Sequence, residues 1–372
     1  MRLQFAGRAE PGVGISLELQ IVDLETWLPV PAASSLLTMM GDEPCIREGL
    51  FQSIAVIETD IFPTVDLMGQ ELRRLLNRLR LTCATHGLGV LAAGTHPLAG
   101  WRDLHLSQQP RYETFIRRLQ WVGRRAAVFG LRIQVGMPDG EKAIAVGNSI
   151  ASLVPMFVAL SASSPFWRGL DTGLASCRTR VIENIPNAGL PPNLLNFGEF
   201  QAYVKTLRAA ETIESINDIW WDVRPNVRHG TLELQACDMP HTVRECLALT
   251  ALAQALIVWV RQTYEEGGVM PQIATWIVRE NKWRATRFGL DAELVATPDG
   301  GLRGIRSLFD ELRLQLEPTW RRLGLEAYFA DLEQIFQHGP GYLRQRRALQ
   351  ELGLEQVPGA IMDELSRDQA YG

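Results

Sequence analysis

Three segments of the chain share one alternating pattern of apolar and polar positions. They cover residues 14–21, 131–136 and 231–236. Because successive side chains of a strand point to opposite faces, each segment predicts a strand with one apolar and one polar face. The polar positions carry Ser16, Glu18, Gln20, Arg132, Gln134, Thr231, Glu233 and Gln235. If the three strands share one sheet, this polar face is either solvated surface, which is the commoner case, or the floor of a functional site.

The rest of the chain alternates between further strands and amphipathic helices. Strands are predicted at residues 53–59 and 88–94, and helices at residues 66–86, 111–129, 142–161 and 199–216. Residues 162–200 are rich in Ser, Gly, Pro and Asn, which predicts a long structured loop of the kind that often covers a substrate. Residues 218–224 and 230–238 are expected to pair as strands, and the chain is mostly helical from residue 242 onward. The pattern therefore predicts an α+β fold, with an antiparallel or mixed sheet backed by helices and a helical C-terminal third.

Composition and charge narrow the possible function classes. The 372 residues are 46% hydrophobic and 21% charged, which argues against disorder, and the net charge of −5 argues against a general nucleic-acid binder. The five cysteines are scattered and form no CxxC pair, so we expect reduced thiols in a cytoplasmic protein, with neither a disulfide framework nor a zinc site. The first residues lack the apolar core of a signal peptide. The longest apolar stretches, near residues 150–162 and 246–260, are expected to be too short or too polar to span a membrane.

Seven short fragments carry chemically informative residues in a defined order. They are Gly14-x-x-x-Glu18, Gly94-Thr95-His96-Pro97, Arg111-Tyr112, Ala175-Ser176-x-Arg178, Trp221-Asp222-x-Arg224-Pro225, Gly230-Thr231-x-Glu233 and Asn281-x-x-x-Ala285-x-Arg287. No single fragment is specific, but their order and spacing resemble the glutamate–cysteine ligase type 2 family, the YbdK-like carboxylate–amine ligases. The resemblance covers roughly residues 12–300 and weakens in the C-terminal helices.

The resemblance implies a fold and a reaction. The fold is related to the catalytic domain of glutamine synthetase, in which a curved, mainly antiparallel sheet forms the floor of an active-site funnel that holds ATP and divalent ions. In the reaction, a substrate carboxylate attacks the γ-phosphate of ATP, and an amine then displaces phosphate from the acyl phosphate to form an amide. Glutamate and cysteine are the usual pair in this family, with weak turnover. We therefore expect one ligase-like domain over residues 1–372, with residues 302–372 as a helical extension packed on it, and a homo-oligomer such as a dimer.

The resemblance also implies roles for individual residues, with ATP and Mg²⁺ as cofactors and an amino acid and an amine as substrates. Metal binding is expected of Glu18 and Glu233, because Mg²⁺ prefers oxygen ligands. Catalytic roles are expected of Arg224 and Arg287, because guanidinium groups offset the charge of a transferring phosphoryl group. Binding of substrate or ATP is expected of Thr95, His96, Arg132, Arg178, Thr231, Gln235 and Asn281. A structural role remains the alternative for each of them, as an ion-pair partner, a backbone-bonded loop residue or a solvated strand residue.

Several positions depart from the family pattern. Ser16 and Val56 stand where glutamates are expected, Arg132 and Gln134 replace a His-x-His pair, and Gln235 replaces an arginine. Loss of single oxyanion donors elsewhere costs about 10²–10³ in rate, so these changes together predict a slow, altered or absent reaction. Three hypotheses stay open: a weak ATP-dependent ligase, a degenerate non-catalytic member that senses a nucleotide or binds a partner, and a floor rebuilt so that Arg132 recruits an anionic substrate in place of an ion.

Overall fold

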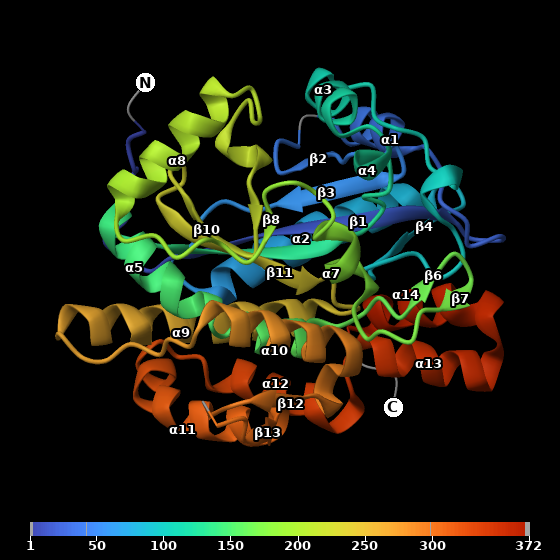
Figure 1. Ribbon diagram of the computed structural model, residues 1–372. Helices are drawn as coiled ribbons and strands as arrows, with labels where there is room; N and C mark the ends of the chain where they lie inside the picture. The colour runs from blue at the N-terminus through green and yellow to red at the C-terminus, as the bar shows by residue number, and fades with distance from the viewer. Residues whose placement is uncertain (1–2, 42, 298, 369–372) are drawn as a thin grey trace.

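A seven-stranded antiparallel sheet forms the centre of the protein, as seen in a computed structural model that describes residues 3–41, 43–297 and 299–368 (Figure 1). The strand order is β10-β11-β5-β1-β3-β2, and β4 pairs with the far part of β1. The strands are β1 (Val13–Asp23), β2 (Ile46–Glu48), β3 (Ile54–Glu58), β4 (Leu88–Leu91), β5 (Gly130–Gly136), β10 (Val223–Asn226) and β11 (Thr231–Asp238). The ends of the predicted domain, residues 1–2 and 369–372, lie outside the described residues.

The three segments with the alternating pattern are neighbours in this sheet. β5 lies between β1 and β11, and its register places Arg132 opposite Ser16, and Gln134 opposite Glu233. Residues directly opposite each other in an antiparallel pair share a face. The sequence-based prediction of one sheet with a common polar face is therefore confirmed.

Helices cover the apolar face of the sheet. They are α2 (Val65–Ala84), α5 (Gly140–Ala151), α6 (Val154–Ser161) and α9 (Val243–Glu265). Three of them have an N-cap residue whose side chain accepts a backbone N–H of the first turn: Thr64 for α2, Asp139 for α5 and Thr242 for α9. Strand residues such as Leu17 and Ile133 are completely or almost completely buried against these helices, which form the main hydrophobic core.

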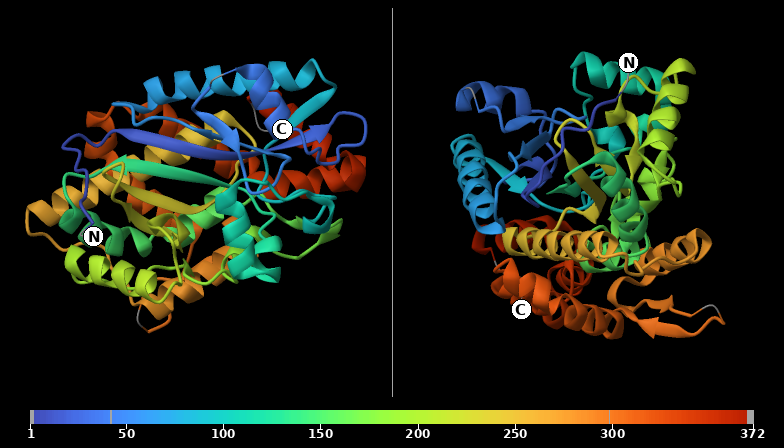
Figure 2. Two further views of the ribbon diagram at one scale, coloured as in Figure 1. Left: turned by 90° about the horizontal axis from the view of Figure 1, so that it is seen from above. Right: turned by 90° about the vertical axis from the view of Figure 1, so that its left-hand side faces the viewer.

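Helix α9 is the longest helix among the described residues and is largely buried. Its length and composition would allow it to cross a membrane, so the expectation that residues 246–260 are too short or too polar was wrong. In the protein, 89% of its most apolar window is buried, between the sheet on one side and α11 (Ile305–Arg322) and α12 (Glu326–His338) on the other (Figure 2, right). Burial among other elements accounts for its apolar character.

The C-terminal part is helical but includes a hairpin that the sequence pattern did not predict. The helices that follow α9 are α10 (Thr275–Phe288), α11, α12, α13 (Gly341–Leu352) and α14 (Val357–Arg367), and the hairpin consists of β12 (Glu293–Val295) and β13 (Leu302–Gly304). Arg344 of α13 joins three helices, because its guanidinium lies 2.7 Å from Glu245 of α9 and 2.9 Å from Glu364 of α14. All three side chains are buried, so this ionic cluster ties the last helices to the body of the protein.

Loops and short elements cover the polar face of the sheet (Figure 1). They include α3 (Pro110–Leu119), α4 (Trp121–Arg124), β6 (Phe166–Trp167), β7 (Leu170–Asp171), α7 (Cys177–Ile182), β8 (Ala188–Gly189) and β9 (Trp220–Trp221). At the two edges of the sheet, α1 (Ala33–Met40) packs on α2 and β2, and α8 (Phe197–Ala209) packs on α5. The predicted long loop at residues 162–200 therefore contains a short helix, α7, that packs on β11. Polar-face residues such as Gln20 and Glu233 are buried beneath this cover.

Two predicted helices are each broken into two. The helix predicted at residues 111–129 ends at Gln120, whose φ of 49° is left-handed and cannot continue a right-handed helix. The helix predicted at residues 142–161 becomes α5 and α6, which meet at an angle of 62°. Pro155 lies in the first turn of α6, where its missing N–H costs no helical hydrogen bond.

Candidate functional site

Acidic and basic side chains alternate across the polar face of the sheet, which we call the polar floor. Glu18 of β1 lies 2.6 Å from Arg132 of β5, and Glu233 of β11 lies 3.2 Å from Arg224 of β10. A third pair, Arg47 of β2 with Glu58 of β3, lies 3.3 Å apart toward the edge of the sheet. Each carboxylate of the floor therefore has a guanidinium partner from a neighbouring strand.

The two predicted metal ligands have both of their carboxylate oxygens in use. Glu18 accepts Arg132 on one oxygen and the backbone N–H of Gly130, at 3.0 Å, on the other. Glu233 accepts Arg224 on both oxygens and the Asn226 amide at 3.0 Å. Burial alone would raise the pKa of Glu233, but attraction by Arg224 and Arg132, together with these hydrogen bonds, lowers the pKa below its ordinary value. Glu233 is thus held as a carboxylate that is already paired.

This set of side chains does not fit a protein-bound metal cluster. Within the described residues, no group of three or more Asp, Glu, His or Cys side chains is placed to hold a metal ion. The floor position opposite Glu18 is filled by Val56, which is buried and offers no ligand atom. Because the carboxylates face guanidinium groups, their arrangement suits ion pairing better than the shared oxygen shell that Mg²⁺ requires.

A small cavity opens on the polar floor beside Glu18, and we call it the floor cavity. Its lining includes two acids and three cations: Glu18, Asp222, Arg132, Arg178 and Lys282. Gln235 and Trp220 complete much of the wall. The volume is about 20 Å³, which is room for about one water molecule. A phosphate or carboxylate group would enter only if side chains of the wall moved apart.

Lys282 is a wall residue that sequence reasoning missed. It is 3% exposed, and its Nζ lies 2.6 Å from Asp222 and 2.8 Å from Glu183. Burial opposes its charge, but these two carboxylates outweigh burial and raise the pKa of Lys282. A signal was present in the sequence, because Lys282 falls on the buried stripe of α10 with Val278, Asn281 and Ala285, where a lysine is unusual.

Arg178 and Gln235 bring unused donors to the same cavity. Arg178 is 7% exposed, and its guanidinium donates to the backbone oxygen of Gln235 at 3.1 Å and lies 3.8 Å from Asp238. Its Nε, like the side-chain nitrogen of Gln235, has no hydrogen-bond partner among the described residues. Gln235 lies in a bulge of β11, between the paired positions Leu234 and Cys237, which breaks the regular alternation of the strand.

The predicted substrate residues Thr231, Thr95 and His96 make contacts within the protein. The Thr231 hydroxyl donates to Gln134 on the floor at 3.0 Å, and the Thr95 hydroxyl donates to the backbone oxygen of Phe166 at 2.8 Å. Both ring nitrogens of His96 bond backbone groups, one at Trp27 and the other at the N–H groups of residues 98 and 99. Burial lowers the pKa of His96 to about 4, so its ring is neutral. None of the three lines the floor cavity.

The other predicted residues, Arg224, Asn281 and Arg287, also lie outside the lining of the floor cavity. Arg224 is buried and donates to two backbone oxygens at 2.7 Å in addition to Glu233. Asn281 holds Val295 of β12 through a pair of hydrogen bonds of 3.0 and 2.7 Å. Arg287 is exposed on α10 and donates to the backbone oxygen of Gly173. A role for them in catalysis or binding stays a prediction.

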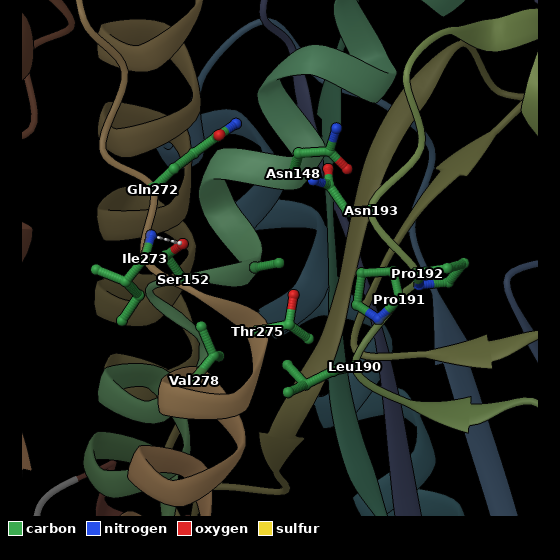
Figure 3. A pocket seen from close by; sticks show the side chains of 11 residues that line it. Asn148, Ser152, Leu190, Pro191, Pro192, Asn193, Gln272, Ile273, Thr275 and Val278 are labelled. Atoms are coloured by element: carbon green, nitrogen blue, oxygen red, sulfur yellow. Dashed lines mark hydrogen bonds between the residues drawn. The ribbon is translucent and has the colours of Figure 1, made fainter. Parts of the chain in front are cut away.

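A second cavity lies away from the polar floor, between α5, residues 190–193 and the start of α10 (Figure 3). Its volume is about 50 Å³, and its polar groups are uncharged: Asn148, Ser152, Asn193, Gln272 and Thr275. Ser152 already accepts the backbone N–H of Ile273 at 3.2 Å. Because phosphate and carboxylate recognition favours cations, the floor cavity is the better candidate for an anion-handling site.

Comparison with known proteins places this chain in a family. A family model described as Glutamate-cysteine ligase family 2 (GCS2) matches residues 12–368. A protein of Gloeobacter violaceus named "Putative glutamate–cysteine ligase 2" is 40% identical over 353 residues, which are 93% of this chain and 94% of that protein. A protein of the same name from Thermobifida fusca is 37% identical over 371 residues, covering 98% of this chain and 93% of that protein.

Solved structures agree with the predicted fold. A glutamate–cysteine ligase from Francisella tularensis, solved in complex with AMP, superposes with a TM-score of 0.73 at 10% identity and covers 99% of this chain and 90% of that chain. A bifunctional glutathione synthetase from Pasteurella multocida gives a TM-score of 0.65 at 13% identity, covering 95% of this chain and 52% of that chain. The predicted α+β fold of the glutamine-synthetase-like ligase type is confirmed. From its residues 12 to 368, the chain belongs to glutamate–cysteine ligase family 2.

Proposed function

We propose that this protein is an ATP-dependent ligase that joins the side-chain carboxylate of an amino acid, of the glutamate type, to an amine, of the cysteine type. The observation that carries the proposal is the floor cavity, where Arg132, Arg178 and Lys282 meet on the polar face of the sheet. Cations in this arrangement suit two anions, a substrate carboxylate and the phosphates of ATP. Family membership and the AMP complex of the Francisella protein support the assignment of nucleotide and reaction class.

The proposed reaction has two steps. A carboxylate oxygen of the acid attacks the γ-phosphorus of ATP, the bond to the β-phosphate oxygen breaks, and ADP leaves. The amine nitrogen then attacks the acyl carbon and loses a proton, and phosphate leaves with one of the original carboxylate oxygens. In this scheme Arg178 and Gln235 offer their unused N–H groups to the phosphoryl oxygens, and preorganised donors of this kind act mainly by stabilising developing charge.

Magnesium enters the proposal as the ion that ATP carries in solution. The floor glutamates are engaged by arginines, so we assign no ion to the protein and no step to a metal. Two further expectations belong to the proposal: a cytoplasmic location, from the scattered cysteines without a CxxC pair, and a homodimer, from the family resemblance.

Transfer of oxygen from the acid to phosphate tests this mechanism directly. Purified protein is mixed with ATP, Mg²⁺, cysteine and glutamate labelled with ¹⁸O in its side-chain carboxylate. We expect ADP, the amide and inorganic phosphate that carries one ¹⁸O atom. Amide formation with unlabelled phosphate would exclude the acyl phosphate, and absence of ADP with every amino acid tested would contradict the ligase assignment.

A degenerate, non-catalytic protein that binds a nucleotide or a partner is the second candidate function. The small volume of the floor cavity, about 20 Å³, and the pairing of Glu18 and Glu233 with arginines favour it. Saturable ATP binding without ADP release would support this candidate. Introducing Ser16→Glu together with Gln235→Arg should raise ADP release if the floor is merely eroded, because both changes restore charges of the family pattern.

A further inference from the structure

Arg132 lies near carboxylates that come from three different strands. It bonds Glu18 of β1 at 2.6 Å, it shares Ser16 as a cross-strand neighbour with Glu58 of β3, and Glu233 of β11 lies opposite Gln134, two residues along β5. Burial opposes the charge of Arg132, but these carboxylates outweigh burial and raise its pKa. A cation that bonds one acid and lies near acids of two other strands is in a position that a divalent ion would take in a metal-binding floor.

We propose that the Arg132 guanidinium replaces a divalent cation, so that the polar floor is held together and neutralised without any protein-bound metal ion. The inference deepens the proposed function, because it concerns the same floor. It rests on the proposed function only for the anions that the floor would bind, a substrate carboxylate and the phosphates of ATP. The inference holds whether or not the protein catalyses a reaction.

Occupied oxygens are the first reason why a metal ion would not bind beside Arg132. Mg²⁺ takes oxygen ligands at about 2.0–2.1 Å in near-octahedral geometry. Each Glu18 oxygen already accepts a hydrogen bond, one from Arg132 and the other from Gly130, so a metal ion would have to compete with these donors for the oxygen lone pairs. Glu233, which is 3% exposed, accepts Arg224 on both oxygens and Asn226 on one, so a metal ion would meet the same competition there.

Charge balance is the second reason. The floor carries the three carboxylates Glu18, Glu58 and Glu233, and the three guanidinium groups that pair with them belong to Arg132, Arg47 and Arg224. The charges of these six side chains cancel. A divalent ion placed beside Glu18 would add two positive charges next to Arg132 and would be repelled at short range.

Binding of Mn²⁺ to the nucleotide-free protein tests the inference. The free Mn²⁺ signal in electron paramagnetic resonance is titrated against the unmodified protein, against Arg132→Gln and against the control Arg321→Gln, which removes an exposed arginine paired with Glu317 on α11, away from the floor. We expect the unmodified protein and Arg321→Gln to bind Mn²⁺ no more tightly than about 1 mM, the weak end of protein sites for divalent ions. Arg132→Gln frees Glu18 and should tighten binding at least tenfold, in competition with Mg²⁺.

The results that would overturn the inference are equally distinct. Saturable binding of Mn²⁺ by the unmodified protein well below about 1 mM would contradict it, and this measurement decides the question even if Arg132→Gln does not fold. Equal Mn²⁺ affinities of Arg132→Gln and Arg321→Gln would also contradict it. If the unmodified protein releases ADP and also binds Mn²⁺ tightly, the inference is contradicted and the ligase assignment is kept. If it neither releases ADP nor binds Mn²⁺ tightly, only the ligase assignment is contradicted.

Discussion

Lys282 of α10 and Asp222, which lies just before β10, form a buried ion pair with 2.6 Å between Nζ and Oδ2. Glu183 contacts the same ammonium at 2.8 Å, so one cation serves two carboxylates. The pair connects a helix that follows the sheet in sequence with the loops that cover the polar floor, and both residues line the floor cavity. The ion pair between Lys282 and Asp222 therefore holds two walls of the floor cavity together.

Replacing Lys282 with methionine should destabilise the protein strongly. The change leaves Asp222, which is 5% exposed, without its cation. Breaking a buried ion pair by removing one partner costs about 3–5 kcal/mol, because a buried charge is left uncompensated. Urea unfolding of Lys282→Met against the unmodified protein measures the loss.

The double variant Lys282→Met with Asp222→Asn is the control for this prediction. It removes the stranded charge as well as its partner, so it should regain part of the lost unfolding free energy. A single variant that loses less than about 1 kcal/mol, the range of exposed pairs, would show that the pair is not desolvated in solution.

His96 should make the stability of the protein fall as the pH drops below neutrality. Burial lowers its pKa from the ordinary 6.5 to about 4, against a backbone hydrogen bond to Trp27 and the nearby charge of Asp103, which favour the protonated form. The unfolded chain binds a proton near pH 6.5 and the folded chain does not, so stability is complete above 6.5 and is lost progressively toward about pH 4. The loss from this group amounts to about 3 kcal/mol over the whole window.

Unfolding of His96→Asn at several pH values isolates this contribution. The variant loses hydrogen bonds of the ring and should be less stable than the unmodified protein at neutral pH. The difference should narrow by about 2 kcal/mol between about pH 7 and about pH 5, because asparagine does not titrate. A constant difference over this range would mean that His96 takes up its proton normally in the folded protein.

Gly130→Ala should disturb the floor cavity through Arg178. A Cβ at this position would lie 2.3 Å from a terminal nitrogen of the Arg178 guanidinium, so Arg178 must move. The backbone bond from Gly130 to Glu18 can remain, because alanine keeps its N–H. We expect a loss of about 1–3 kcal/mol in stability, typical of overpacking, together with at least a tenfold loss in the rate of ADP release. An unchanged rate would show that the position of Arg178 does not matter for the reaction.

The sheet was predictable from the sequence because its signal is local. Alternation within three short segments was enough to predict strands with a common polar face, and Glu18, Arg132 and Glu233 do gather there. The breaks at Gln120 and between α5 and α6 were not predictable from periodicity, because the apolar pattern continues across both of them. The hairpin of β12 and β13 was missed because its strands are only three residues long.

The site was only partly predictable because its members depend on tertiary contacts. Periodicity places Glu18 and Glu233 on one face but says nothing of their pairing with arginines from neighbouring strands. Lys282 and Asp222 meet only because α10 crosses near the loop before β10, sixty residues away in sequence. A lysine on a buried helical stripe was the available signal, and its partner could not be named without the fold.

Titration of ATP into the purified protein, with and without Mg²⁺, tests most directly whether the floor cavity handles the nucleotide. The comparison uses the unmodified protein, Arg178→Gln, which removes a cation of the cavity wall, and Arg321→Gln, which removes an exposed cation paired with Glu317 on α11. We predict saturable binding that weakens at least tenfold in Arg178→Gln, a change of about 1.4 kcal/mol, and that is unchanged in Arg321→Gln. Absence of ATP binding, or equal affinities for all three proteins, would contradict a nucleotide site on the polar face of this sheet.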